Sequence, residues 1–374
     1  MSIHPKAAAR FRAVLSGAVL AAGIVACGGG GDDDPAPPPV VTPPVATSAY
    51  ATSVLVADTA PASHVDPNLI NAWGIAFNPT GFVWVNNQGS STSTLYDGTG
   101  VPQTLVVAIP AGSAGAARPT GIVFNASTDF KVTQNGVTGA SPFIFVGEAG
   151  TVSGWSPTVN RTNAITTVDT GGTASYKGLA IASANGANFI YATDFRNSRI
   201  DVYDANFQKA TLPGGGFTDP NLPAGYAPFG IQAAGNRIYV SYVQRNAAGT
   251  EEVKGAGLGV IDAYDTSGAF VARIATGGAL NAPWGMAIAP AAFGDFSNSL
   301  LVANFGDGKI NAYNPTTGAL MGTLSRADKS PIVIDGLWGI AFGNGVQQQP
   351  TTSLFYTAGP ANETHGQYGK IELQ

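Results

Sequence analysis

A short apolar motif built around a glycine recurs along the 374 residues of this chain. In each copy the glycine follows Trp, Thr, Lys or Phe and precedes Ile, Leu or Met. The glycines are Gly74, Gly121, Gly178, Gly230, Gly285 and Gly339. They are spaced 47, 57, 52, 55 and 54 residues apart, and self-similarity at such a period indicates a repeat architecture.

Each repeat contains further short runs of β-branched and aromatic residues that are separated by turn residues. A second run follows the glycine motif, as at residues 82–85 and 300–303, and a third run ends in a turn signal, as at residues 200–204. Such runs predict β-strands. The 49 glycines and 25 prolines together make 74 of the 374 residues, which favours a turn-rich all-β chain. Four strands in each of six repeats predict an all-β, six-bladed β-propeller over residues 48–374.

Large and small residues alternate within the glycine motif. In the first copy, Trp73, Ile75 and Phe77 share one face of the strand, whereas a glycine and an alanine occupy the other. We expect the bulky face of one blade to pack against the small face of the next. This packing explains the repeated tryptophans and glycines without a ligand.

The ring of blades must close on itself. After Gly339 the chain offers two strands and then a third at residues 369–373. The segment 51–57 precedes the first motif and has the composition of a strand. We expect it to pair with residues 369–373 as the fourth strand of the last blade, because this pairing removes two open sheet edges.

The first 27 residues are typical of an export signal. Lys6, Arg10 and Arg12 form a basic region, and residues 13–26 form an apolar run that is shorter than the roughly 20 residues of a transmembrane helix. The run is followed by Cys27, the single cysteine of the chain, in a pattern that resembles the bacterial lipobox. The resemblance implies that Cys27 is lipidated, and the alternative is an ordinary cleavable signal with a chance cysteine.

Residues 28–47 are rich in Gly, Asp and Pro and predict a flexible, extended tether. A glycine follows Cys27, which by resemblance to bacterial lipoproteins implies the outer membrane. Lipidation of Cys27 would leave no thiol for a disulfide, a zinc site or a nucleophile. The net charge of −5 and the pI near 5.1 indicate no nucleic-acid partner and no membrane contact beyond the lipid anchor, and we expect a monomer.

Several segments resemble known propeller families. Residues 194–204, which read Asp-Phe-Arg-Asn-Ser-Arg-Ile-Asp-Val-Tyr-Asp, resemble one repeat of the NHL class. Residues 66–76, 93–98 and 363–371 are similar to an exported bacterial propeller family known only as conserved hypothetical, with a mild departure at residues 367–368. These resemblances imply the propeller fold and export. They do not imply one activity, because such propellers range from scaffolds to lyases and lactonases.

Polar residues recur where the second strands end. Alignment of the repeats places at equivalent positions Asn87, Glu148, Asp194, Tyr242, Asn304 and Ala358. Equivalent positions of a propeller lie on a circle about its axis, and oxygen ligands suit Ca²⁺ or Mg²⁺. By resemblance to gluconolactonase-like lactonases, the predicted ligands of one axial ion are Asn87, Glu148, Asp194 and Asn304. The alternative is that each residue caps its own turn.

A second candidate cluster joins the two ends of the propeller. His64 and Asp66 enter the first blade, and Glu363 and His365 precede the last strand. Ring closure brings these segments together, so the four side chains could bind a transition metal or form an acid–base pair. The alternative is a polar clasp in which Asp66 and Glu363 accept backbone hydrogen bonds.

The chain carries no strong catalytic motif, because none of its serines lies in a Gly-x-Ser-x-Gly elbow. We therefore expect an envelope-tethered propeller that binds a small-molecule ligand or a protein. The alternative is a divalent-metal-dependent hydrolase or lactonase with an axial metal site.

Overall fold

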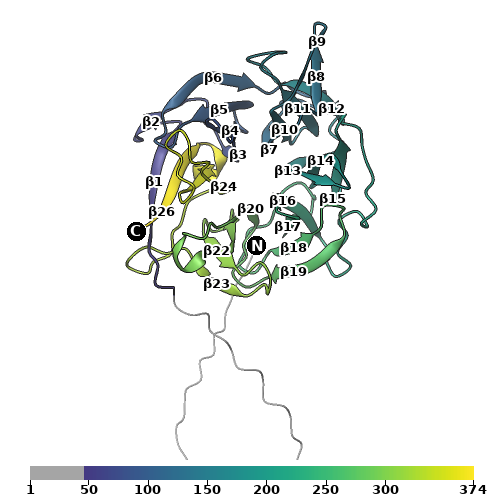
Figure 1. Ribbon diagram of the computed structural model, residues 1–374. Helices are drawn as coiled ribbons and strands as arrows, with labels where there is room; N and C mark the ends of the chain where they lie inside the picture. The colour runs from purple at the N-terminus through teal and green to yellow at the C-terminus, as the bar shows by residue number, and fades with distance from the viewer. Residues whose placement is uncertain (1–45) are drawn as a thin grey trace, which may run out of the picture. The chain divides into compact units, whose positions relative to one another are not determined.

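The computed structural model describes residues 46–374. The predicted signal sequence, Cys27 and nearly all of the predicted tether lie outside the described residues and stay predictions. Among residues 46–374, no helix is long and apolar enough to cross a membrane. This part of the chain forms six sheets arranged around a central axis, as predicted, and they are antiparallel except where a two-residue strand pairs in parallel with the first strand (Figure 1).

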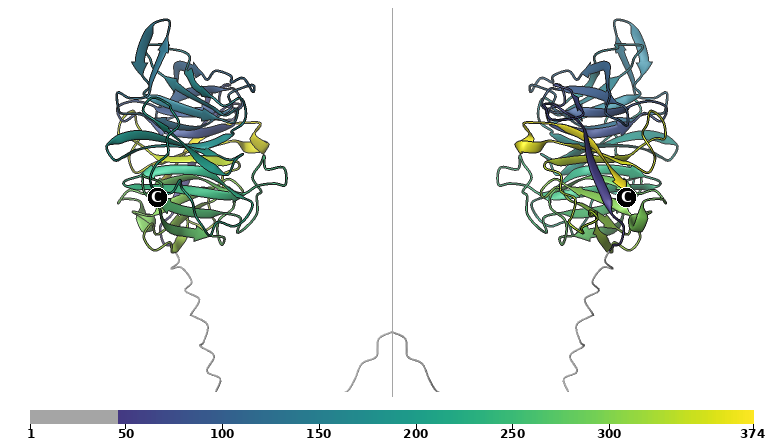
Figure 2. Two further views of the ribbon diagram at one scale, coloured as in Figure 1. Left: turned by 90° about the vertical axis from the view of Figure 1, so that its right-hand side faces the viewer. Right: turned by 90° about the vertical axis from the view of Figure 1, so that its left-hand side faces the viewer.

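The first three blades follow one another along the chain. Blade 1 is β3 (Ala72–Phe77), β4 (Val83–Asn87), β5 (Thr92–Tyr96) and β6 (Pro102–Ala108). Blade 2 is β7 (Pro119–Phe124), β10 (Phe143–Gly147), β11 (Thr151–Trp155) and β12 (Ile165–Asp169). Its first connection carries the hairpin β8 (Lys131–Gln134) and β9 (Val137–Ala140), which projects from the disc (Figure 2). Blade 3 is β13 (Tyr176–Ala184), β14 (Ala187–Asp194) and β15 (Arg199–Asp204).

The remaining three blades complete the ring. Blade 4 is β16 (Tyr226–Ala234), β17 (Arg237–Gln244), β18 (Val260–Tyr264) and β19 (Phe270–Thr276). Blade 5 is β20 (Pro283–Ile288), β21 (Leu300–Asn304), β22 (Ile310–Tyr313) and β23 (Leu320–Thr323), with the short helix η1 (Gly294–Phe296). Blade 6 is β24 (Leu337–Phe342), β25 (Leu354–Ala358), β26 (Gln367–Leu373) and β1 (Tyr50–Ala57), with β2 (His64–Val65) beside β1 and the single turn α1 (Pro360–Glu363) before β26.

The predicted closure of the ring is confirmed. β1 pairs antiparallel with β26 from Tyr50 opposite Leu373 to Ala57 opposite Gln367. Figure 2 shows the two strands side by side although they come from opposite ends of the described chain. The last blade therefore has no open edge at β26.

Blade 3 departs from the prediction of four strands in every repeat. After β15 the chain turns at Phe207, whose φ of 59° is left-handed, and Ala210 N donates one hydrogen bond to Val202 O where a fourth strand would start. Pro213 and the three glycines that follow it then lead away as a loop. Proline lacks the donor that a ladder needs, so the fourth strand does not form.

The repeated glycines are needed where the inner strands of neighbouring blades meet. A Cβ atom on Gly178 would lie 2.8 Å from the carbonyl oxygen of Phe229 in the next blade, and one on Gly339 would lie 2.7 Å from that of Trp73. The small face of each motif therefore packs against the backbone of the next motif, not only against its side chains. Thr193 Oγ1 also donates to Phe229 O at 2.7 Å, which ties blades 3 and 4 together.

Two faces of the disc can now be distinguished. Each inner strand begins where the second strand of its blade ends, as at Ala72 opposite Asn87 and Pro283 opposite Asn304. We call this the entry face, and the opposite side the exit face. The described chain begins on the exit face, where Thr47 and Ser48 bind the carboxylate of Asp295 in the connection between β20 and β21.

Candidate functional site

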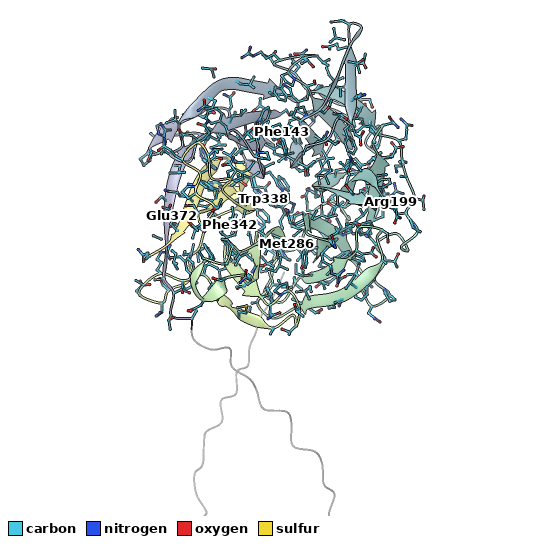
Figure 3. The ribbon with its side chains drawn as sticks, in the orientation of Figure 1. Phe143, Arg199, Met286, Trp338, Phe342 and Glu372 are labelled. Atoms are coloured by element: carbon cyan, nitrogen blue, oxygen red, sulfur yellow. The ribbon has the colours of Figure 1, made fainter. Side chains whose placement is uncertain are left out.

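An aromatic cluster fills the axis of the propeller near the entry face. Its buried members are Trp73, Phe195, Ala227, Phe229, Val243, Ala282, Trp284, Phe305 and Trp338. They come from five blades, which is possible because the inner strands converge on the axis. Trp338 stacks on Trp73 and on Phe305, each with ring centroids 3.7 Å apart, and Figure 3 shows Trp338 on the inner side of the ring. We call this cluster the axial plug.

Lys177 is a buried charged side chain beside the axial plug. It precedes Gly178 in the third motif, at the position that Trp73, Trp284 and Trp338 hold in other blades. Its side chain is only 2% exposed, and its ammonium lies 5.1 Å from the centroid of the Trp73 ring. Cation–π contact of this kind stabilises a buried ammonium only in part, so a counter-charge is required.

Glu148 supplies that counter-charge through an ion pair with Lys177. Gln88 Nε2 donates a further hydrogen bond to Glu148 Oε2 at 2.6 Å. Burial would raise the pKa of Glu148, but the Lys177 ammonium, the Gln88 hydrogen bond and the Arg118 charge together outweigh burial and hold that pKa below its ordinary value. Burial would likewise lower the pKa of Lys177, and the carboxylates of Glu148 and Glu252 outweigh it and raise that pKa. Both groups are therefore ionised at neutral pH.

Three more carboxyl groups surround the pair. Glu251 and Glu252 lie in the connection between β17 and β18, and Glu363 ends α1. Burial, followed by repulsion from neighbouring carboxylates, raises the pKa of each of the three, and the nearby Lys177 lowers it in part. Asn71 connects this group to the plug, because its Nδ2 donates to Glu363 Oε2 at 2.9 Å and its Oδ1 accepts from Trp338 Nε1 at 2.9 Å.

A pocket of about 630 Å³ opens on the entry face beside the ion pair. Blade 2 contributes Arg118 and Glu148, blade 3 contributes Ser175 and Arg196, and the connection after β17 contributes Glu251. Arg245 pins this connection to blade 3, because its guanidinium donates to Arg196 O at 2.9 Å. The pocket has the size of an ordinary small-ligand site and is lined by charges of both signs.

The predicted metal ligands do not share one set of partners. Asp194 accepts hydrogen bonds from Ser175 N and from Asn197 in its own turn, and it contacts the Arg199 guanidinium. Asn304 Nδ2 donates to Ala279 O and to Asp307. These contacts agree with the alternative interpretation, in which each of these residues caps its own turn.

Glu148 does not lie in the predicted ring position. In the register of β7 and β10, Gly147 lies opposite Pro119, as Asn87 lies opposite Ala72. Glu148 is therefore one residue further, at the position where Phe195 follows β14 and Phe305 follows β21 to join the axial plug. This position explains why Glu148 meets Lys177 and not the other predicted ligands.

Two oxygens of the predicted metal set have no partner among residues 46–374. They are the buried Oδ1 atoms of Asn87 and Asn304. The two carboxylates of the set are occupied by the contacts above, so the four residues as a group do not fit one ion. The described residues also contain no group of three or more His, Cys, Asp or Glu side chains placed to hold a metal. Binding of Ca²⁺ or Mg²⁺ stays a prediction.

The second predicted cluster is divided among separate contacts. Asp66 accepts from Tyr96 Oη at 2.8 Å and from Asn68 N at 2.9 Å, whereas Glu363 faces the plug. His365 Nδ1 lies 2.8 Å from Asp58, and His64 lies in β2 with no described hydrogen-bond partner in the propeller for its ring. The two segments do meet, because Asn71 N donates to His365 O at 3.1 Å. The carboxylate that accepts a backbone hydrogen bond across the closure is Asp58, from Gly366 N at 3.0 Å.

The sequence reading missed Lys177 as a site residue. The signal was present, since five of the six motifs carry an aromatic residue or Thr before the glycine and the sixth carries Lys. The sequence could not show that Glu148 is the partner of Lys177, because the two residues belong to different blades and meet only when the blades pack into a ring.

Comparison with known proteins finds relatives along most of the chain. No protein-family model matches it. The uncharacterized protein R648 of Acanthamoeba polyphaga mimivirus is 32% identical over 320 residues, which cover 84% of this chain and 77% of R648. The uncharacterized protein L690 of the same virus is 34% identical over 289 residues, which cover 75% of each chain.

Solved structures support the fold. A gluconolactonase from Xanthomonas campestris, XC5397, aligns with a TM-score of 0.51 at 12% identity, covering 88% of this chain and 91% of that one. At this identity the likeness extends to the propeller fold alone. The predicted resemblance to an exported bacterial family is thus supported for the fold, while bacterial origin, the lipoprotein signal and the NHL-like repeat stay predictions.

Proposed function

The chain belongs to the same protein family as the mimivirus proteins R648 and L690, and we propose that it is a binding propeller whose entry-face pocket holds a small polar ligand. The observation that carries this proposal is the pocket of about 630 Å³ whose lining includes Glu148, the partner of the buried Lys177. Concave sites with a few fixed polar groups are the usual form of ligand-binding sites.

The state of the ion pair supports binding over proton transfer. The pKa of Glu148 is lowered and that of Lys177 is raised, so each group is held in its charged form across the neutral range. A general acid or base works best with a pKa near the working pH. The pair is therefore suited to be a fixed dipole that orients a ligand.

Filling the pocket tests the proposal. Ala116 lines the pocket and is exposed, so Ala116→Trp should occupy the site without disturbing the core. We expect the dialysable small-molecule fraction of the expressing cells to raise the melting temperature of the wild type and not of this variant. A ligand at a hundredfold excess over its Kd adds about 2.7 kcal/mol.

The matched control is Ala126→Trp, an exposed alanine after β7 on the exit face. It should respond to the extract as the wild type does. An extract that shifts all three proteins equally, or none of them, would count against the entry-face pocket as the binding site.

A second candidate function is the metal-dependent hydrolase, and the partnerless Oδ1 atoms of Asn87 and Asn304 favour it. This candidate predicts that millimolar Ca²⁺ raises the melting temperature, that EDTA lowers it, and that Asn87→Ala combined with Asn304→Ala removes both responses. The reason is that an ion that binds only the folded state stabilises it by mass action. A wild-type protein that responds to neither reagent would remove the support for this function.

A further inference from the structure

Two arginines line the entry-face pocket. Arg118 precedes β7 in blade 2, and Arg196 lies in the turn between β14 and β15 in blade 3. Both are exposed, and within residues 46–374 neither guanidinium has a hydrogen-bond or ion-pair partner. Exposed arginines without partners are common on protein surfaces, but two that line one pocket offer a concave pair of positive charges.

Hydrogen bonds hold the backbone of both arginines in place. The carbonyl oxygen of Arg118 accepts a hydrogen bond from Glu148 N at 3.2 Å, and that of Arg196 accepts from the Arg245 guanidinium at 2.9 Å. The rim of the pocket is thus anchored to the ion pair on one side and to the connection after β17 on the other. A fixed backbone leaves only the two side chains to be ordered when a ligand binds.

Within residues 46–374, neither carboxylate of the pocket forms an ion pair with the two arginines. Glu148 is already paired with the buried Lys177. Glu251 is the other carboxyl group of the lining, and its pKa is raised by burial and by Glu252 and Glu148, against the partial lowering by Lys177 and Arg118. It is one negative charge against two arginines. The lining therefore presents more unpaired positive than negative charge to a ligand.

The rest of the lining is suited to hydroxyl groups. Ser175 and Thr250 contribute side-chain hydroxyls, and Glu251 contributes a carboxyl group at the rim. The remaining lining consists mainly of glycines and alanines, and Phe195 lies fully buried beneath it. A purely apolar anion would leave these polar groups unsatisfied, which costs affinity.

We infer that the pocket binds a hydroxylated organic oxyanion, a sugar carboxylate or sugar phosphate, with its anionic group between Arg118 and Arg196. Guanidinium groups pair with the oxygens of both anions through two parallel hydrogen bonds. The hydroxyl groups of the ligand then reach Ser175, Thr250 and Glu251. This inference rests on the proposed binding function and names the class of ligand.

Calorimetric titration of the full chain tests the inference with five probes: D-glucuronate, glucose 6-phosphate, D-glucose, hexanoate and inorganic phosphate. We expect at least one of the two sugar anions to bind about tenfold or more tightly than each of the other three. Arg118→Gln and Arg196→Gln should each weaken this binding about tenfold or more, because a charged hydrogen bond is lost. Added salt should weaken it as well.

Arg161→Gln, an exposed arginine between β11 and β12, is the matched control and should bind as the wild type does. The inference is overturned if neither sugar anion binds, if glucose or hexanoate binds as tightly, or if folded Arg118→Gln and Arg196→Gln both retain wild-type affinity. A different outcome is that the extract raises the melting temperature of the wild type and not of Ala116→Trp while neither sugar anion binds. That pair of results would overturn this inference and leave the proposed binding function standing.

Discussion

A chain that begins at residue 58 is expected not to fold, whereas a chain that begins at residue 46 should fold as the full protein does. The shorter chain lacks β1, whose Tyr50 and Val56 are fully buried and whose Leu55 is 7% exposed. Burial of each such side chain contributes about 1.5–3 kcal/mol. Their sum approaches the 5–15 kcal/mol that is the whole stability of an ordinary domain. Circular dichroism with thermal melting and size-exclusion chromatography would show the difference.

The loss of β1 also exposes β26 along its length. That strand pairs with β1 over Gln367–Leu373, and its unpaired backbone groups would then be open to other chains. We therefore expect the chain from residue 58 to elute as aggregates. A monomeric elution with a melting temperature within a few degrees of the longer chain would show that β1 is not needed to close the ring.

The sequence was sufficient to predict the propeller because the same strand motif recurs in each of the six blades. The glycine before Ile, Leu or Met recurs in every blade, and each glycine meets the backbone of the next blade. A signal that appears six times survives the irregularity of any one copy. Blade 3 shows the limit, because the loop after Phe207 replaces a strand that the repeat alone predicts.

The site was harder to predict because it depends on register. A shift of one residue in the alignment of blade 2 placed Glu148 with Asn87, whereas the strand pairing places Gly147 there. In a strand, one residue changes the face on which a side chain lies. Glu148 thereby lies beside the axial plug and not in the predicted metal ring, and its partner there is Lys177.

The pocket was invisible in the sequence for a different reason. Arg118, Arg196 and Glu251 are far apart along the chain and lie in three separate connections. Each looks like an ordinary surface charge when read alone. Loops carry such groups to one place only because the blades hold their ends on the same face.

Replacement of Lys177 by methionine should destabilise the protein by about 3–5 kcal/mol at neutral pH, which is the usual cost of removing one partner of a buried ion pair. Methionine keeps much of the apolar volume of the lysine stem, so the loss would report the charge. Glu148, whose side chain is 18% exposed, would remain as an anion without its counter-ion. The double variant Lys177→Met with Glu148→Gln should recover most of the loss, because it removes both buried charges. Urea denaturation of the four proteins in this cycle gives the coupling energy.

The pH dependence provides an independent readout of the same pair. In the wild type the pKa of Glu148 lies below its ordinary value of 4.5, so its contribution to stability is present above that value and is lost as the pH falls through the folded-state pKa. In Lys177→Met burial would raise the pKa of Glu148, so protonation on acidification relieves the unpaired charge. The stability difference between wild type and Lys177→Met should therefore narrow as the pH falls from 7 toward 4. A difference that stays constant over this range, or single variants whose effects simply add, would mean that Glu148 and Lys177 do not act as a pair.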